Sequence, residues 1–293
     1  MSEKGTSSDQ PRIAVVSVSY NSGESLRRFL STVVPSSSSA LTSFVVDNVP
    51  EGDPEARSIV EAARSRYLWF GKNLGYGAAI NAAVAKLPPH YEWILVSNPD
   101  VELREGSLDV LVTDGDADPS VGCVGPTILT SHGEVYPSAR SVPSLRTGVG
   151  HALFAGVWPA NPWTRRYKQD GGTYQVARDA GWLSGACILI RRSVFDEVGG
   201  FDDGYFMYFE DVDLGFRVGG AGYRNVFEPR AVVVHSGAHS TSGDSRRMIR
   251  AHHDSARRFV NRKYRGPLLW PIRLVLGLGL RLRSAIVQRI PAR

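Results

Sequence analysis

Short apolar runs alternate with helix-compatible segments through the first two thirds of the chain. The runs RIAVVSVSY at 12–20, SFVVDN at 43–48 and EWILVSN at 92–98 are typical of strands. A predicted helix between the last two begins after Asp53 and has Pro54 in its first position, where proline is well tolerated. This alternation is typical of βα units. We therefore expect an α/β fold, Rossmann-like, with a mostly parallel sheet and helices on both faces.

The two ends of the chain differ from this pattern. The N-terminal MSEKGTSSDQPR is polar and lacks the apolar core of a signal peptide, so we expect residues 1–11 to be disordered and the protein to be cytoplasmic. Residues 246–293 hold 13 Lys or Arg and one acid, a net charge of +12, while the rest of the chain carries −7. We therefore expect a main domain at 12–242 and a basic C-terminal extension at 243–293. Charge alone would suit anionic lipid, an acidic partner or nucleic acid.

Both cysteines lie in apolar runs, Cys123 in VGCVGP and Cys187 in GACILI. Neither has the spacing of a metal-binding motif. We expect both to be buried and reduced, with no disulfide and no zinc site.

Polar residues follow the predicted strands at each exit. The exits carry Tyr20-Asn21, Asp47-Asn48 and Asn98-Pro99-Asp100, and a glycine-rich turn carries Asn73. Parallel sheets bind ligands at the carboxyl ends of their strands. Turn chemistry explains any one of these residues by itself, but together they predict a binding site. The chain lacks both a G-x-G-x-x-G after the first strand and a P-loop, which argues against a dinucleotide dehydrogenase and a P-loop NTPase.

The segment YFMYFEDVDLGFR at 205–217 places three acids directly after a run of aromatic residues. Acidic residues are favourable in the first turn of a helix, where backbone N–H groups are unpaired. On a helix, however, Glu210, Asp213 and Arg217 would share one side, with Asp213 and Arg217 spaced for a structural ion pair. Asp211 would point about 100° away from Glu210. A favourable position in the first turn of a helix therefore does not by itself account for the acid at Asp211.

An ordered set of motifs resembles the inverting family 2 glycosyltransferases, which have the GT-A fold. The resemblance spans roughly Ile13 to Ser240, and its wording in NPDV and YFEDVDL is most similar to bacterial rhamnosyltransferases. The basic, apolar extension is similar to that of actinobacterial members, which move L-rhamnose from dTDP-rhamnose onto polyprenyl-diphosphate-linked N-acetylglucosamine in building the cell-wall (arabinogalactan) linker. The motifs are VSVSYN, VVDN, NLGYGAAIN, SNPDVEL, WLSGACILIRRSVFDEVGGFDDGYFMYFEDVDLGFRVGGAGYR and VVVHSGAHS.

The resemblance implies a donor site and a divalent cation, Mg²⁺ or Mn²⁺, which would offset the charge of the leaving diphosphate. The metal-binding acid of the family's D-x-D motif corresponds to Asp100, and Asn98 stands where the first acid usually lies. His235 corresponds to a second metal ligand in some members, or it is a core histidine that ends a strand. Asp47 corresponds to the contact with the pyrimidine ring, unless it only closes a turn. The implied nucleotide-sugar residues are Tyr20, Asn21, Asp47, Asn73 and Asn98.

The resemblance also implies an acceptor site. An inverting transfer needs a general base on the face opposite the diphosphate, and the family's base corresponds to Asp211. The aromatic residues before it would form a partly dry wall that packs against sugar rings. Glu210 would orient a neighbour or the acceptor. Trp182, Ser184 and Gly185 would lie near the sugar and the acceptor, although Trp182 also fits plain core packing.

These implications predict transfer of a single sugar, because the Q-x-x-R-W motif of the family's processive synthases is absent. Other hypotheses are a transferase with another donor such as UDP-galactofuranose, a nucleotidyltransferase, and a non-catalytic module that binds sugar nucleotides or nucleic acid. The C-terminal extension has no charge-free run longer than 274–280, too short to span a bilayer. We expect it to bind the inner face of the plasma membrane peripherally, rather than nucleic acid. The alternative is a helical pair that packs on the domain or forms an oligomer.

Overall fold

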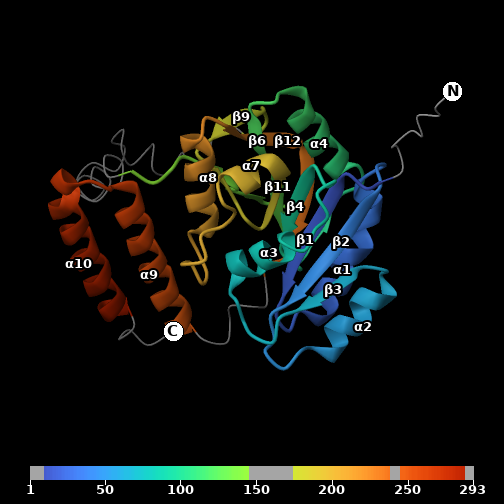
Figure 1. Ribbon diagram of the computed structural model, residues 1–293, viewed down its shortest axis with the longest axis horizontal. Helices are drawn as coiled ribbons and strands as arrows, with labels where there is room; N and C mark the ends of the chain where they lie inside the picture. Colours follow the sequence, from blue (N-terminus) through green and yellow to red (C-terminus); the bar gives the residue numbers. More distant parts are fainter. Residues whose placement is uncertain (1–9, 145–173, 238–244, 288–293) are drawn as a thin grey trace.

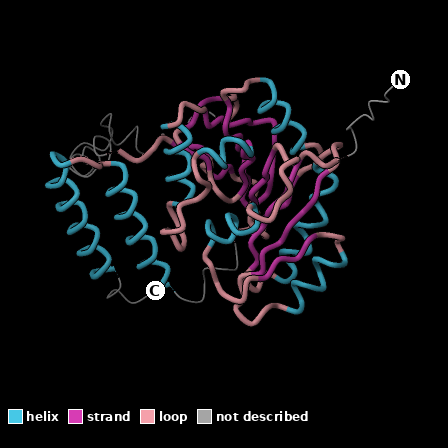
Figure 2. Tube along the Cα trace, in the orientation of Figure 1, coloured by secondary structure: helices cyan, strands magenta, loops and turns pink. Residues whose placement is uncertain are grey.

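The computed structural model describes residues 10–144, 174–237 and 245–287 (Figure 1). Its centre is a large twisted sheet with helices on both faces, and a pair of helices follows at the C-terminal end (Figure 2). The predicted α/β fold is therefore confirmed. Both cysteines are free and buried, as expected.

The main sheet has the strand order β3-β2-β1-β4-β11-β6-β12-β5, with β7 and β9 paired at its margins. Strands β3, β2, β1 and β4 are parallel, as are β6 and β12, whereas β11 is antiparallel to both of its neighbours. Strands β8 and β10 form a separate small sheet. The strands are β1 Ile13–Ser19, β2 Leu41–Asp47, β3 Arg66–Trp69, β4 Trp93–Ser97, β5 Val101–Leu103, β6 Val121–Thr130, β7 Val135–Tyr136, β8 Ala139–Arg140, β9 Arg178–Ala180, β10 Trp182–Leu183, β11 Cys187–Arg191 and β12 Arg224–His235.

Helices cover the two faces of the sheet and bury two separate apolar clusters. One cluster contains residues of α1, α2 and α4, and the other contains residues of α3, α7 and α8. Strand β1 serves both clusters, because successive side chains of a strand point to opposite faces. The helices are α1 Gly23–Val33, α2 Pro54–Ala62, α3 Tyr76–Val84, α4 Ser107–Ala117, α7 Arg192–Glu197, α8 Glu210–Gly220, α9 Ser245–Lys263 and α10 Trp270–Val287, with 3₁₀ turns η1 Val34–Ser36 and η2 Pro267–Leu269.

Local sequence explains why several of these helices form where they do. In α1 the buried residues Leu26, Phe29, Leu30 and Val33 repeat every three or four positions, which places them on one face of a helix. Helix α2 begins as predicted, because the Asp53 carboxylate accepts hydrogen bonds from the backbone N–H groups of its first turn. Such a cap satisfies donors that would otherwise lack a partner.

The C-terminal helices form an antiparallel pair in which α9 lies against the main body and α10 lies outside it (Figure 1). Large apolar side chains are exposed on the outer part of the pair, including Leu268 at 90% and Val275 at 68%. Over the residues that the structure describes, every helix is too short or too polar to cross a membrane.

Candidate active site

The exits of three parallel strands meet at one edge of the sheet, which we call the C-terminal edge. Strands β2, β1 and β4 lie side by side and end there. Strand β11 is antiparallel to β4, with Cys187 opposite Ser97, so it begins at the same edge. The Asn98 N–H donates to the Ala186 carbonyl at 2.9 Å. The segment before β11 therefore lies beside the exit of β4.

Asn98, Asp100 and His235 come together at this edge. His235 Nε2 lies 3.0 Å from Asp100 Oδ1 and 3.3 Å from Asn98 Nδ2. Burial raises the pKa of Asp100, but the hydrogen bond and charge of His235 outweigh it, so the pKa is lowered. Asp100 is thus a carboxylate at neutral pH. Among the described residues, no group of three His, Cys, Asp or Glu side chains is placed to hold a metal ion.

Asp47 is fully buried beneath the loop that follows β2. Its carboxylate accepts hydrogen bonds from the N–H groups of Val49 at 2.9 Å and Asp53 at 2.6 Å, and from the Tyr67 hydroxyl. Burial, together with this carboxylate, raises the pKa of Tyr67 to about 12. The observed contacts are those of a residue that closes a turn, while the expected contact with a pyrimidine ring stays a prediction.

The remaining predicted donor residues surround the same edge. Tyr20 is 46% exposed, and Asn21 has a positive φ of 53°, in a region that Asn tolerates. Asn73 Oδ1 accepts from the Gly75 N–H at 2.9 Å. The neighbouring Asn48 fixes this loop, since its amide donates to the Gly75 carbonyl at 2.9 Å. Exposed Tyr20 and Asn21 are therefore open to a ligand, and Asn73 shapes the turn beside them.

Asp211 lies in the first turn of α8, and the backbone of the segment before β11 holds its carboxylate. The Gly185 N–H donates to Asp211 Oδ2 at 3.0 Å, and the Val212 N–H donates to Oδ1 at 2.8 Å. Burial raises the pKa of Asp211, and these two N–H groups and the charge of Arg140 oppose the rise. Hydrogen bonds to a carboxylate favour its charged form. Asp211 is thus a part-buried acid, and the hydrogen bonds that it accepts favour its charged form.

Tyr76 supports this arrangement from α3. Its hydroxyl donates to the Gly185 carbonyl at 2.6 Å. Gly185 is itself close to the acid, because a Cβ built on it would lie 3.4 Å from Asp211 Cβ. Burial raises the pKa of Tyr76 well above its usual value, so the hydroxyl stays protonated and donates. The sequence analysis did not single out Tyr76.

Glu210 differs from its neighbour in having almost no polar contact. Its side chain is 8% exposed, and its Oε2 atom has no hydrogen-bond partner. Burial and the adjacent charge of Asp211 raise the pKa of Glu210 to about 8. Glu210 is therefore protonated at neutral pH. A protonated carboxyl has an O–H donor, which a carboxylate lacks.

The loop before α8 is held in an unusual conformation. Tyr208 and Phe209 have φ values of 69° and 65°, a left-handed region that is uncommon for bulky residues. Gly75 approaches this loop so closely that a Cβ there would lie 2.4 Å from the Phe206 carbonyl oxygen. The Tyr76 N–H donates to that same oxygen at 3.1 Å. Such conformations persist only where surrounding contacts enforce them.

Helix α9 provides many of these contacts. The Ser255 hydroxyl donates to the Met207 carbonyl at 2.8 Å. The His252 ring lies 5.6 Å from the Tyr208 ring and 5.4 Å from the Phe209 ring, and Phe259 lies 5.8 Å from Phe209. The C-terminal extension therefore packs on the loop that leads to Asp211. This agrees with the alternative prediction of a helical pair packed on the domain.

Asp213 has a structural role, as its spacing predicts. It is fully buried, and its carboxylate accepts from Arg217 Nε at 2.7 Å. Arg262 Nε of α9 lies 2.9 Å from the other carboxylate oxygen, and the Tyr205 hydroxyl donates to that oxygen at 3.3 Å. Arg262 also pairs with Asp202. The pair with Arg217 could be predicted from local spacing, whereas the contact with Arg262 could not.

Two predicted acceptor-site residues have clear structural contacts. Trp182 Nε1 donates to the Ser141 carbonyl at 3.1 Å, and the Cα and Cβ atoms of Trp182 fill the space beside Gly215. Ser184 is buried, and its hydroxyl accepts from the Ala186 N–H at 3.3 Å. Trp182 therefore takes part in core packing, and a sugar contact by either residue stays a prediction.

Comparisons with known proteins identify the family of this chain. A family model described as "Glycosyltransferase like family 2" matches residues 11–252. An N-acetylglucosaminyl-diphospho-decaprenol L-rhamnosyltransferase of Mycobacterium tuberculosis is 41% identical over 287 residues, which cover 94% of this chain and 93% of that protein.

Two solved structures share the fold at low sequence identity. A Pyrobaculum calidifontis mannosyltransferase in complex with GDP-Man and Mn²⁺ superposes with a TM-score of 0.57 at 16% identity, covering 94% of this chain and 71% of that one. GalNAc-T7 with UDP, GalNAc and Mn²⁺ has a TM-score of 0.58 at 15% identity, covering 85% of this chain and 47% of that one. The family match over most of the sequence and the 41% identical relative show that the chain belongs to glycosyltransferase family 2, and the two solved structures agree with its GT-A fold.

Proposed function

We propose that the protein transfers a single L-rhamnose from dTDP-rhamnose onto N-acetylglucosamine linked to a polyprenyl diphosphate, with inversion, in building the cell-wall linker. The observation that carries the proposal is the Asp211 carboxylate, which the Gly185 N–H holds at the C-terminal edge. The choice of sugar and acceptor follows the Mycobacterium tuberculosis relative, whose name states that chemistry. The match covers 94% of this chain and 93% of that relative.

In the proposed reaction, Asp211 acts as the general base. The acceptor hydroxyl attacks the anomeric carbon of the sugar, and Asp211 takes the proton of that hydroxyl. The bond from the anomeric carbon to the diphosphate oxygen breaks, and dTDP leaves with the electron pair. A base must be charged and within hydrogen-bond reach of the hydroxyl, and the N–H groups of Gly185 and Val212 favour the charged form. Protonated Glu210 would donate a hydrogen bond to the acceptor.

A divalent cation, Mg²⁺ or Mn²⁺, fits the donor atoms of Asp100 and His235. The carboxylate and the imidazole lie within hydrogen-bond distance of one another, and the amide nitrogen of Asn98 lies 3.3 Å from the imidazole. Two protein ligands suffice in principle, because such ions are commonly completed by water and substrate phosphates. The bound ion would offset the charge that develops on the leaving diphosphate. Asp100 and His235 would hold it there.

Binding of Mn²⁺ to the wild-type chain and to an Asp100→Asn variant would test this metal site directly. Electron paramagnetic resonance in the presence of dTDP should show bound Mn²⁺ for the wild type and at least about tenfold weaker binding for the variant, since metal ligands and their partners typically matter by that much. Chelator should suppress transfer, and added metal should restore it. Equal Mn²⁺ binding by both proteins would contradict the assignment.

A donor screen with one defined acceptor tests the proposed reaction. Purified protein would be incubated with polyprenyl-diphospho-N-acetylglucosamine and, separately, dTDP-rhamnose, UDP-galactofuranose, UDP-glucose or GDP-mannose. Mass spectrometry should detect a single added deoxyhexose with dTDP-rhamnose alone. Transfer from UDP-galactofuranose instead would favour the alternative donor. Absence of transfer from every donor would contradict the proposed function.

We further propose that the protein works on the inner face of the plasma membrane, held there peripherally by α9 and α10. Exposed Leu268, Trp270 and Val275 support this location, since such side chains enter the boundary of a bilayer while nearby arginines meet anionic headgroups. A lipid-linked acceptor would be reached at that surface.

A further inference from the structure

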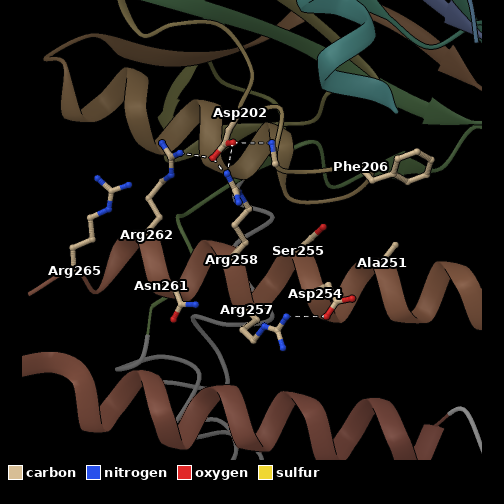
Figure 3. A pocket seen from close by; sticks show the side chains of 11 residues that line it. Asp202, Phe206, Ala251, Asp254, Ser255, Arg257, Arg258, Asn261, Arg262 and Arg265 are labelled. Atoms are coloured by element: carbon tan, nitrogen blue, oxygen red, sulfur yellow. Dashed lines mark hydrogen bonds and ion pairs between the residues drawn. The ribbon is translucent and has the colours of Figure 1, made fainter. Parts of the chain in front are cut away.

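A groove of about 630 Å³ runs between α9 and the loop that precedes α8 (Figure 3). Asp202, Gly204 and Phe206 of that loop form one side of the groove, and residues of α9 and its C-terminal end form the other. The lining residues of the second side are Ala251, Asp254, Ser255, Arg257, Arg258, Asn261, Arg262 and Arg265. The groove lies outside the C-terminal edge that contains Asp100 and Asp47.

The groove is strongly basic for its size. Four arginines and two aspartates line it, so its side chains carry a net charge of +2. Arg258, Arg262 and Arg265 point to the side of α9 on which Asp202 lies (Figure 3). The guanidinium group is suited to phosphate, because its planar fork of N–H donors binds two oxygens at once. The lining therefore favours an anion with phosphate-like oxygens.

Part of this positive charge is already paired, and part is not. Asp202 pairs with both Arg258 and Arg262, and Arg258 uses its Nε and Nη2 atoms for that contact. Arg265 is exposed and, within the described part of the chain, its side chain has no hydrogen-bond or ion-pair partner. Arg262 also pairs with Asp213, and Arg257 pairs with Asp254. Arg265 is therefore the lining arginine that offers all its donors to a ligand.

The groove lies between the proposed base and an exposed apolar surface. At one side, the carbonyl of Phe206 accepts from the Tyr76 N–H, and the Tyr76 hydroxyl contacts Gly185, which holds Asp211. At the other end, Arg265 is followed three residues later by Leu268, which is 90% exposed. The proposed base, the arginines of the groove and the exposed apolar residues therefore follow one another in that order.

We propose that this arginine groove binds the diphosphate of the lipid-linked acceptor. The inference rests on the proposed function and adds the site at which the acceptor's charged link is recognised. A polyprenyl-diphosphate-linked sugar has the same order of parts, with a sugar, then a diphosphate, then an apolar chain. Binding the diphosphate at Arg258, Arg262 and Arg265 would place the sugar toward Asp211 and the chain toward Leu268.

The same basic groove would also attract other phosphates, so the test separates them. We would compare wild type with Arg265→Gln in the full-length chain, using a water-soluble acceptor in which geranyl diphosphate carries N-acetylglucosamine. The matched control is Arg273→Gln, which removes the same charge from α10 at a position outside the groove. A second acceptor would carry the sugar on an uncharged geranyl chain.

The expected result is a KM for the diphosphate acceptor about tenfold higher in Arg265→Gln, the effect of losing one hydrogen bond to a charged group. The KM for dTDP-rhamnose and the KM for the uncharged acceptor should match those of the wild type. Arg273→Gln should match the wild type with all three substrates. Arg265→Lys should recover part of the loss, since it keeps the charge but not the planar fork.

Binding measurements identify other ligands and separate the two proposals. Calorimetric titration with geranyl diphosphate should show weaker binding to Arg265→Gln than to the wild type. This difference should appear even if the wild type transferred no sugar. In that case the proposed function would fail and the groove assignment would stand. An unchanged KM in Arg265→Gln would overturn the groove assignment. So would a defect confined to binding of phosphatidylglycerol vesicles that hold no acceptor, because a lipid headgroup would then be the ligand.

Discussion

Asp211 and Glu210 are neighbours in sequence, yet their surroundings give them different chemistry. The carboxylate of Asp211 accepts two backbone hydrogen bonds, whereas Glu210 Oε2 has no partner in a nearly closed environment. Two adjacent carboxyl groups resist ionising together, because like charges disfavour one another, and the charge of Asp211 raises the pKa of Glu210. The two backbone hydrogen bonds favour the charged form of Asp211 over that of Glu210. In the proposed reaction Asp211 is therefore the base, and Glu210 is its protonated neighbour.

The first prediction concerns Asp211→Asn, which keeps the shape of the side chain and removes its ability to accept a proton. Turnover should fall by about 10²- to 10⁴-fold, the usual contribution of a general base. Binding of dTDP-rhamnose, measured by calorimetry, should remain close to that of the wild type. A variant with more than half of the wild-type turnover would show that another group accepts the proton.

The second prediction concerns Glu210→Gln and the pH dependence of stability. The pKa of Glu210 is about 8 in the folded chain and about 4.3 in an unfolded one. Between these values the folded state binds more protons than the unfolded state, so the wild type loses stability as pH rises. Glutamine has no such proton, and the variant should gain melting temperature relative to wild type from about pH 5 to about pH 8.

Differential scanning fluorimetry of both proteins over that interval tests the second prediction. The gap between their melting temperatures should widen as the pH rises and then level off. A gap that is constant with pH, or that narrows toward alkaline pH, would mean that Glu210 ionises as an ordinary carboxyl.

At the scale of elements, α9 acts as a brace for the loop at 202–209. Its residues contact the loop through a hydrogen bond to Met207, through aromatic rings on Tyr208 and Phe209, and through ion pairs with Asp202. The loop contains two successive residues of positive φ, which cost of order 1–3 kcal/mol each. Contacts from α9 offset that cost, and the extension therefore supports the geometry of Asp211.

The third prediction follows from the ion pairs of this brace. Arg262→Gln would leave the fully buried Asp213 with Arg217 as its one remaining cationic partner, and loss of a partner from a buried charge costs up to about 3–5 kcal/mol. Both the melting temperature and kcat should fall, with little change in the KM for dTDP-rhamnose. Urea denaturation and steady-state kinetics measure the two effects.

Arg27→Gln is the matched control for the third prediction. Arg27 pairs with Glu24 on the surface of α1, where both side chains are more than half exposed. Exposed pairs of this kind contribute roughly 0–1 kcal/mol, so this variant should resemble the wild type in stability and in kcat. Equal losses in the two variants would argue against a specific brace.

At the scale of the whole molecule, charge and apolar surface are divided unevenly. The segment 246–293 carries +12, while the rest of the chain carries −7. Exposed large apolar residues also gather on η2 and α10, where Leu268, Trp270 and Leu278 are each more than half exposed. A surface that combines basic and apolar side chains is suited to an anionic membrane.

The fourth prediction is that this surface attaches the protein to membranes. Replacing Leu274, Val275 and Leu278 by Ser should move the protein from the membrane fraction to the soluble one, because the apolar side chains no longer enter the bilayer boundary. Removing residues 266–293 should have the same effect and should weaken use of the lipid-linked acceptor more than donor binding. Sedimentation with phosphatidylglycerol vesicles measures the change.

Val34→Ser is the control for the fourth prediction, since Val34 is 70% exposed in η1, outside the C-terminal helices. It should leave the membrane fraction unchanged. Full retention of both altered proteins in the membrane fraction would contradict peripheral attachment by α10.

The amino-acid sequence by itself determined features that depend on local spacing. Alternating apolar runs predicted the α/β sheet, Asp53 and Pro54 predicted the start of α2, and the interval from Asp213 to Arg217 predicted their ion pair. These predictions succeed because hydrogen bonds and side-chain directions within one element repeat with a known period. The ordered motifs added the family, which the comparisons confirm.

Only the tertiary structure decided which distant residues meet and which polar atoms lose water. Asp100 and His235 are 135 positions apart and lie in hydrogen-bond contact, and Asp213 pairs with Arg262 of α9, in the C-terminal extension. No local pattern encodes these contacts, because they depend on how strands pair and how α9 packs. The same packing removes water from Glu210 and leaves its Oε2 atom without a partner. Burial of this kind sets the protonation state of a site, and it exists only once the elements have assembled.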